Sequence, residues 1–135
     1  EEIEDIFVAA KDYLRNLKAR GIQKDHILQS STLMLLDKNN MTRQYIDDYL
    51  QENQIIIKDS IDISDMDLLI DFARIGVGVA CVIKNFVRED LENGTLVEIP
   101  LGFPIHKREV GFAYKTTTKP SKSLAEFIHF YKTYR

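Results

Sequence analysis

The clearest pattern of hydrophobic and polar positions lies between Ser64 and Ile83. Apolar residues recur there at the spacing of an amphipathic helix, while aspartate and arginine take the opposite face. Ser64 is the predicted N-cap, and Gly76 stands where a left-handed residue would end the helix. The apolar run Val77 to Ile83 is too short for a second helix, so it predicts a strand buried on both faces. Gly78 predicts a close approach of another backbone at the start of that strand.

Periodicity and turn residues divide the rest of the chain into short alternating elements. Strands are predicted within 6–10, 32–36, 54–63, 95–99 and 108–115. Helices are predicted at about 11–20, 25–29, 40–51, 84–92 and 121–134, with Asn40 or Thr42 capping the third. The alternation from 32 to 92 predicts an α/β fold with a mostly parallel sheet. Ligands of such sheets bind beyond the carboxyl ends of the strands, here near 37–43 and 83–85.

Composition narrows the functional classes. The 135 residues suit one domain, and a hydrophobic share of 44% can build a core. The net charge of −3 argues against a surface dominated by phosphate contacts. A single cysteine, Cys81, falls in the predicted buried strand, which excludes an internal disulfide and fits a reducing, cytoplasmic compartment. No apolar run has membrane-spanning length, and the acidic start cannot serve as a signal peptide.

No catalytic constellation emerges from the residue spacing. The three histidines are far apart in sequence and match no metal-ligand spacing, so neither a metal nor another cofactor is expected. Asp59 and Asp62 have opposite parity on a strand and would face opposite ways. Gly76 and Gly78 follow a helix and open a strand, which is the reverse of a dinucleotide-binding motif. We therefore expect no enzyme activity.

The order of the motifs carries a family resemblance. The residues SDMDLLIDFARIGVGVACVI precede VREDLENGTLVEIPL, KREVGFAYK and PSKSLAEFIHF, and upstream lie DIFVAA and LLDKNNMTRQYIDDYL. Together these pieces resemble the effector-binding domain of LysR-type transcriptional regulators, at family spacing over nearly the whole chain. The resemblance implies an α/β fold like type II periplasmic binding proteins, with two subdomains joined by crossover strands and a small effector in the cleft between them.

The resemblance also implies a domain division. Residues 28–103 would form a complete second subdomain, and residues 1–27 and 104–135 would be parts of the first. The family's DNA-binding helix-turn-helix has no counterpart in these residues, so the chain is expected to be a fragment. Such a domain would control DNA binding and transcription by its full-length bacterial parent.

By resemblance, one effector loop consists of Asn40, Met41, Thr42 and Arg43, where Asn40 replaces the serine usual in the family. The helix N-terminus there offers free backbone N–H groups, which favour an anionic effector. The opposite wall would comprise Val82, Ile83, Lys84 and Asn85. On the residues alone, a helix cap and a surface arginine explain Asn40, Thr42 and Arg43 better than an effector site; it is the resemblance that gives effector contact comparable support.

Two further expectations complete the interpretation. Aromatic residues in 108–134 would cover a subdomain that is half missing, which predicts a homodimer or a rearranged terminal segment. The alternative function is a small α/β enzyme or a receiver-like signalling domain. A receiver would need clustered acidic residues after a strand, and the loop after Leu36 offers only Asp37.

Overall fold

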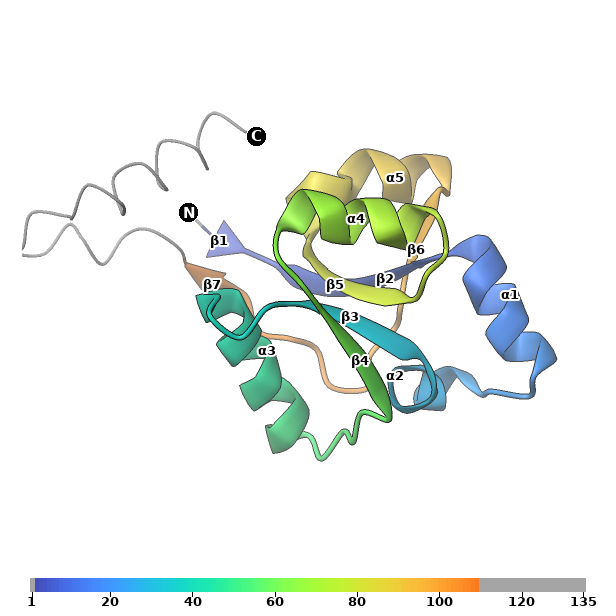
Figure 1. Ribbon diagram of the computed structural model, residues 1–135, viewed down its shortest axis with the longest axis horizontal. Helices are drawn as coiled ribbons and strands as arrows, with labels where there is room; N and C mark the ends of the chain where they lie inside the picture. Colours follow the sequence, from blue (N-terminus) through green and yellow to red (C-terminus); the bar gives the residue numbers. More distant parts are fainter. Residues whose placement is uncertain (1, 110–135) are drawn as a thin grey trace, which may run out of the picture.

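One five-stranded sheet organises the molecule, of which the computed structural model describes residues 2–109 (Figure 1). Its strands are β2 (Asp5–Ala10), β3 (Thr32–Leu36), β4 (Asp59–Ile63), β5 (Val79–Ile83) and β6 (Leu96–Glu98), in the order β4-β3-β5-β2-β6. The predicted parallel pairing is confirmed for β3 with β4 and with β5. Strand β2 runs antiparallel to both β5 and β6, so the whole sheet is mixed.

Strand β2 occupies a central position that its place in the sequence did not suggest. It lies between β5 and β6, and all six of its residues are buried. Strand β2, which lies in the predicted range 1–27, thus shares a sheet with β3, β4, β5 and β6 from the range 28–103. Next to β2, the short strands β1 (Glu2–Ile3) and β7 (Arg108–Glu109) form a separate antiparallel pair at one end of the molecule (Figure 1).

Helices cover both faces of the sheet. Their bounds are α1 (Lys11–Ala19), α2 (Ile27–Ser30), α3 (Met41–Glu52), α4 (Met66–Arg74) and α5 (Arg88–Asn93), with the 3-10 turns η1 (Lys24–His26) and η2 (Lys84–Val87). Helices α4 and α5 lie together on one face, and α3 lies on the other (Figure 1).

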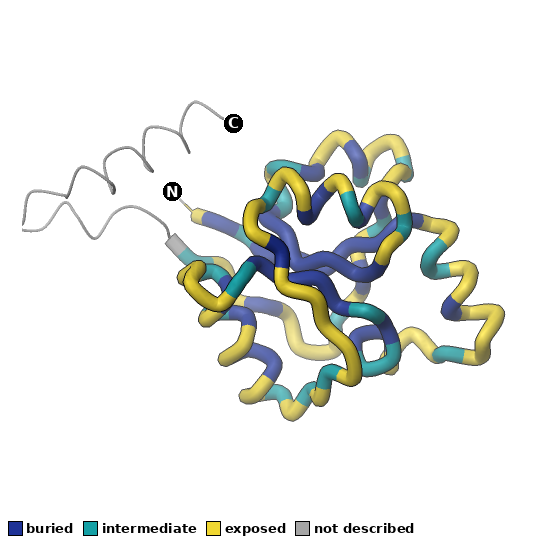
Figure 2. Tube along the Cα trace, viewed as in Figure 1, coloured by how far each residue is buried: buried dark blue, intermediate teal, exposed yellow. Residues whose placement is uncertain are grey.

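The two faces of the sheet build two separate cores. Phe7, Leu33 and Cys81 point to the α3 side, whereas their chain neighbours Val8, Met34 and Val82 point to the α4 side. Figure 2 shows β2, β3 and β5 as the buried centre of the molecule, whereas the edge strand β4 is mostly exposed. The uninterrupted apolar runs of β3 and β5 are thus explained, because both faces of these strands are covered.

Several local predictions are confirmed and three need correction. Gly76 ends α4 with a φ of 85°, and the side chain of Asn40 caps α3 by accepting from the Thr42 N–H. The cap of α4 is Asp65 rather than Ser64, since the Asp65 carboxylate accepts from the Leu68 N–H. The strand predicted from residue 54 begins only at Asp59, after Gln54 adopts a left-handed conformation.

The third correction concerns the segment after β5. A single helix is predicted at 84–92, but the chain forms η2 and then α5, which ends before Gly94 in a left-handed conformation. The predicted strand 108–115 is described only as far as residue 109, and the predicted helix 121–134 lies outside the described residues. Among residues 2–109, no helix is long and apolar enough to cross a membrane.

The close contact predicted at Gly78 yields a stability test. A Cβ atom at this position would lie 2.3 Å from the Thr32 carbonyl oxygen, whereas a Cβ at Gly102 would have no heavy atom within 4 Å. We expect Gly78→Ala to lower the free energy of unfolding by about 1–3 kcal/mol, because β3 and β5 would have to separate. Urea denaturation measures the change, and Gly102→Ala is the matched control. Equal effects of the two substitutions would contradict the packing argument.

Cys81 yields a second prediction, on thiol reactivity. The side chain is buried, and this burial raises the pKa of the thiol well above its ordinary value. The folded protein therefore keeps the thiol neutral where the unfolded chain, with a pKa of about 8.5, ionises. At pH 8.5 a thiol reagent should modify the folded protein far more slowly than the urea-unfolded protein. The free energy of unfolding should decrease as the pH rises above about 8.5, because only the unfolded chain gains the thiolate. In Cys81→Ala, the contribution of this thiol to the decrease should be absent.

Candidate functional site

The carboxyl ends of the parallel strands and the start of β2 meet at one edge of the sheet. Asp5, which opens β2, is the register partner of Ile83, which closes β5. The loop after β3 returns to the same edge, because the Asp37 N–H donates to the Ile63 carbonyl at 3.0 Å. Helix α3 begins directly after this loop. The predicted ligand-binding edge therefore exists, with the N-terminus of α3 placed on it.

A polar cluster of Asp5, Thr42 and Arg108 occupies this edge. Arg108 Nε and Nη2 donate to the two carboxylate oxygens of Asp5 at 2.7 and 3.0 Å. Arg108 Nη2 also donates to Thr42 Oγ1 at 3.0 Å. The Asp5 side chain is 1% exposed and that of Arg108 is 16% exposed, so the ion pair is largely shielded from water. Burial lowers the pKa of Arg108, but the hydrogen bonds and charge of Asp5 outweigh it, and the net pKa is raised.

Tyr45 and Tyr49 of α3 hold the chain segment that leads to Arg108. The Tyr45 hydroxyl donates to the His106 carbonyl at 2.5 Å, and the Tyr49 hydroxyl donates to the Phe103 carbonyl. The guanidinium carbon of Arg108 also lies 5.4 Å from the centre of the Tyr45 ring, within range of a cation–π interaction. Helix α3 thus fixes both the backbone before β7 and the side chain that β7 contributes.

The predicted loop residues divide into different roles. Thr42 joins the cluster, and Asn40 orders the loop as the helix cap. Met41 is 87% exposed and points away from the core. Arg43 is buried and binds Asp47, Asp62 and the Leu36 carbonyl, at 2.9, 2.6 and 3.0 Å. Its guanidinium therefore fastens α3 to the ends of β3 and β4.

The opposite predicted wall, residues 82–85, is only partly at the site. Val82 and Ile83 are core residues with 1% and 8% exposure. The Lys84 N–H donates to the Glu4 carbonyl at 2.9 Å, and its Nζ lies 3.8 Å from Glu4 and 3.6 Å from Glu98. Asn85 accepts from Arg88 at 2.5 Å and belongs to the α4–α5 side instead. The two predicted walls are bridged by the segment Glu4–Asp5.

Three of the described cations at this edge are paired with carboxylates. Arg108 faces Asp5, Arg43 faces Asp62 and Asp47, and Lys84 lies between Glu4 and Glu98. The edge therefore carries no excess of positive charge among residues 2–109. Recognition there would depend on hydrogen-bonding groups rather than on net charge. Thr42 Oγ1 already accepts from Arg108, so its hydrogen remains to be donated to an acceptor atom.

Sequence reasoning missed Asp5, Tyr45 and Arg108 as members of this cluster. Asp5 is a carboxylate at the start of an otherwise apolar strand, and a buried carboxylate requires a partner. This signal could have indicated an ion pair. It could not have named Arg108, which is 103 residues away in sequence.

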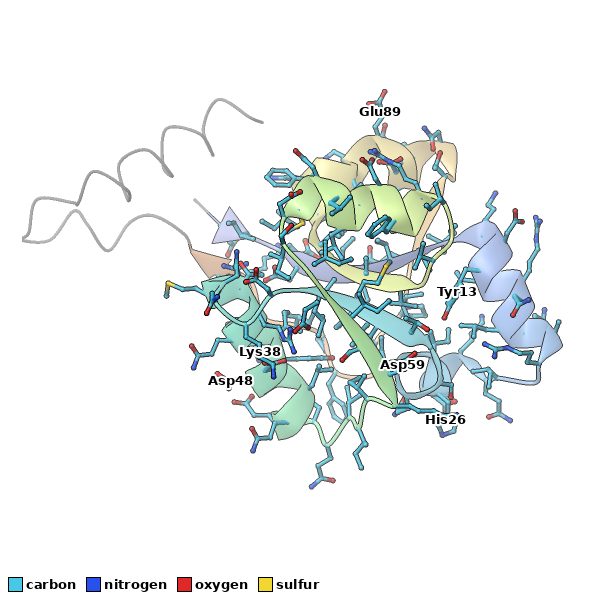
Figure 3. The ribbon with its side chains drawn as sticks, in the orientation of Figure 1. Tyr13, His26, Lys38, Asp48, Asp59 and Glu89 are labelled. Atoms are coloured by element: carbon cyan, nitrogen blue, oxygen red, sulfur yellow. The ribbon has the colours of Figure 1, made fainter. Side chains whose placement is uncertain are left out.

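A cavity of about 720 Å³ lies elsewhere, between α4 and the η2–α5 segment. Its lining includes Asp71, Arg74, Asn85 and Arg88. Arg74 binds both carboxylate oxygens of Asp90 and also Asp71, and Arg88 binds Asn85. These arginines already have partners within the chain. Two of the three histidines, His26 and His106, are exposed; His26 lies near α2 (Figure 3), and His129 is outside the described residues.

The family of this chain follows from its similarity to known proteins. A family model described as the LysR substrate binding domain matches residues 3–135. The chain belongs to this family. No curated protein matches the chain.

Solved structures agree on the LysR-type fold. The regulatory domain of the HypT M206Q mutant from Salmonella typhimurium matches with a TM-score of 0.61 at 17% identity. That match covers 98% of this chain and 64% of the other. The regulatory domain of CcmR from Synechocystis PCC6803, in complex with 2-PG, gives 0.63 at 11% identity and covers 96% and 61%. Full-length HypT, a hypochlorite-specific LysR-type transcriptional regulator, gives 0.58 at 17% identity, covering 96% and 43%. The chain thus spans less than two thirds of the length of these relatives.

Arg43 yields a prediction that separates fold stabilisation from ligand contact. Arg43→Ala should lower the free energy of unfolding by about 2 kcal/mol, because the Leu36 carbonyl and the carboxylates lose a charged donor. Thermal or urea unfolding measures this loss. Arg15→Ala is the matched control, since Arg15 and its partner Asp12 are 74% and 89% exposed, and its effect should be near zero. An unchanged stability of the Arg43 variant would contradict the assignment.

Proposed function

We propose that this chain is the effector-sensing part of the regulatory domain of a LysR-type transcription regulator. The effector is a small molecule that binds at the carboxyl edge of the sheet and contacts the hydroxyl of Thr42. Binding would control DNA binding and transcription by the full-length parent, through a DNA-binding domain that residues 1–135 do not supply. Family membership supports the class of function, and the cluster at the α3 N-terminus supports the location.

The observation that carries the location is the hydrogen bond from Arg108 to Thr42. It fixes the Thr42 oxygen as an acceptor and leaves the hydroxyl hydrogen for a ligand. A matching effector presents an acceptor oxygen, such as that of a carboxylate, a phosphate or a carbonyl group. Related regulatory domains have been solved with small ligands: CcmR in complex with 2-PG, OxyR2 from Vibrio vulnificus with bound sulfate, and HypT with a bound bromide ion.

The site that we propose is narrower than the eight residues suggested by resemblance. Thr42 contacts the effector, Asn40 shapes the loop, and Met41 lines the approach from solvent. Lys84 contributes from the end of β5, where Glu4 and Glu98 leave it about one third exposed. Arg43, Val82, Ile83 and Asn85 support the fold and are omitted. Residues 5–10 are best grouped with 28–103, because β2 is hydrogen-bonded within that sheet.

Two expectations remain predictions. The homodimer was inferred from aromatic residues between 112 and 131, which lie outside the described part of the chain. A regulatory domain needs no turnover, so candidate substrates and phosphodonors should be recovered unchanged. A receiver-like domain would need clustered acidic residues at the end of a strand. Asp37 instead accepts from the Asn39 N–H of its own loop, and Asp5 is paired with Arg108, so the receiver-like alternative gains no support.

Ligand-dependent thermal unfolding tests this proposal. The panel comprises small carboxylates, amino acids, sugar phosphates, 2-PG and inorganic sulfate. A ligand at a hundred times its dissociation constant should add about 2.7 kcal/mol to the free energy of unfolding. Thr42→Val should abolish that shift while the five-stranded sheet stays folded, because valine keeps the shape and removes the hydroxyl.

The matched control is Asp48→Asn, on the exposed side of the same helix (Figure 3). Its saturable shift should equal that of the wild type. A shift that survives in Thr42→Val, or a panel in which no compound produces one, would count against the proposed site.

A further inference from the structure

Arg108 joins three parts of the structure, of which only the small and the large sheet are directly connected by the chain, through Glu4 between β1 and β2. Its backbone in β7 is the register partner of Ile3 in β1, so it belongs to the two-stranded sheet. Its guanidinium binds Asp5, which opens the central strand β2. The same guanidinium binds Thr42 in the first turn of α3. One side chain therefore connects the small sheet, the large sheet and the candidate effector loop.

Besides the Glu4 link to β2 and the bond from the Tyr45 hydroxyl to the His106 carbonyl, two side chains hold the small sheet in place. Within residues 2–109, β1 and β7 pair over two residues each, and an isolated two-stranded ladder is marginal in water. Its anchors are side chains: Ile3 is buried next to Ile83, Met66 and Phe86, and Arg108 is bound to Asp5 and Thr42. The order of the β1–β7 ladder should therefore depend on how firmly Arg108 is held.

Thr42 completes the coordination of Arg108. The Nη2 atom carries two N–H groups, and its two acceptors are one oxygen of Asp5 and the hydroxyl oxygen of Thr42. The arginine side chain is 16% exposed, so water can replace a lost acceptor only in part. Removal of the Thr42 oxygen would leave a shielded, charged donor without its partner, which is unfavourable.

We propose that Arg108 is a positioning residue that couples the Thr42 hydroxyl to the β1–β7 sheet. A change in the hydrogen bonding of Thr42 then alters the order of the strands that flank the large sheet. The inference rests on the proposed function in one respect: the effector is what would change the hydrogen bonding of Thr42. The coupling itself is a property of the ligand-free chain and can be measured without any effector.

Amide hydrogen exchange of the full 135-residue chain, followed by mass spectrometry, tests the coupling. In Thr42→Val, exchange in segments 2–5 and 105–109 should accelerate about tenfold, the value for one charge-assisted hydrogen bond. Exchange in β3 and β5 should be unchanged, which shows that the variant is folded. Thr42→Ser keeps the oxygen and should restore the wild-type exchange of both segments.

The reverse direction is tested with Arg108→Lys. Lysine retains the positive charge opposite Asp5 but lacks the planar fork that reaches Thr42 at the same time. Exchange in residues 41–44 should therefore accelerate, again with β3 and β5 unchanged. Tyr45→Phe distinguishes the connection through Thr42 and Arg108 from the neighbouring connection through Tyr45 and His106. The substitution removes the hydrogen bond to His106 and keeps the aromatic ring near Arg108. Its exchange in residues 2–5 should match the wild type.

Three results would overturn the proposal: acceleration in Thr42→Val confined to residues 41–44, equal acceleration in Thr42→Ser, or acceleration of segment 2–5 in Tyr45→Phe equal to that in Thr42→Val. These outcomes are independent of the ligand panel. A saturable ligand shift without coupling refutes only the role of Arg108. Coupling without any ligand shift refutes only the effector site.

Discussion

The buried carboxylate of Asp5 is the constraint on which the edge of this structure depends. Strand β2 lies inside the sheet, between β5 and β6, and its first residue carries a charge although only 2% of that residue is exposed. An unpaired carboxylate there would be costly, so a cation must come to it. Arg108 supplies that cation from 103 residues away and satisfies both oxygens. Because Asp5 and Arg108 lie near the two ends of the described residues, this ion pair holds those two ends of the chain together.

That ion pair also determines what kind of site the edge can offer. Because Arg108 is neutralised by Asp5, its remaining contribution is the hydrogen bond to Thr42, which sets the polarity of that hydroxyl. Lys84 is similarly balanced by Glu4 and Glu98. Specificity at such an edge comes from the direction of hydrogen bonds rather than from long-range attraction. This differs from the simple expectation of an anion held by a helix N-terminus.

Family resemblance and physical environment agree in part on the candidate residues of the site. The motif around residues 40–43 is placed at the sheet edge, as the resemblance implied, and Thr42 faces the cluster. Arg43 belongs to the same motif but serves a different purpose, since its guanidinium is enclosed by Asp47, Asp62 and the Leu36 carbonyl. One turn of helix sends successive side chains in directions about 100° apart, so adjacent motif residues cannot all face one ligand.

The sequence alone determined the local elements and the class of fold. The apolar run 32–36 indicated a strand, and the run 77–83 indicated a strand covered on both faces, which the structure forms over 79–83. Gly76, Gly78 and Asn40 marked a helix end, a close contact and a cap, all of which the structure confirms. These features are encoded within a few neighbouring residues. Only the tertiary structure decided that β2 inserts antiparallel between β5 and β6, and that Arg108 reaches Asp5 and Thr42. Strand order depends on how the apolar faces of all the elements pack together, and an ion pair such as Asp5 with Arg108 depends on which charges that packing buries side by side. No local sequence pattern specifies which distant residue becomes the partner.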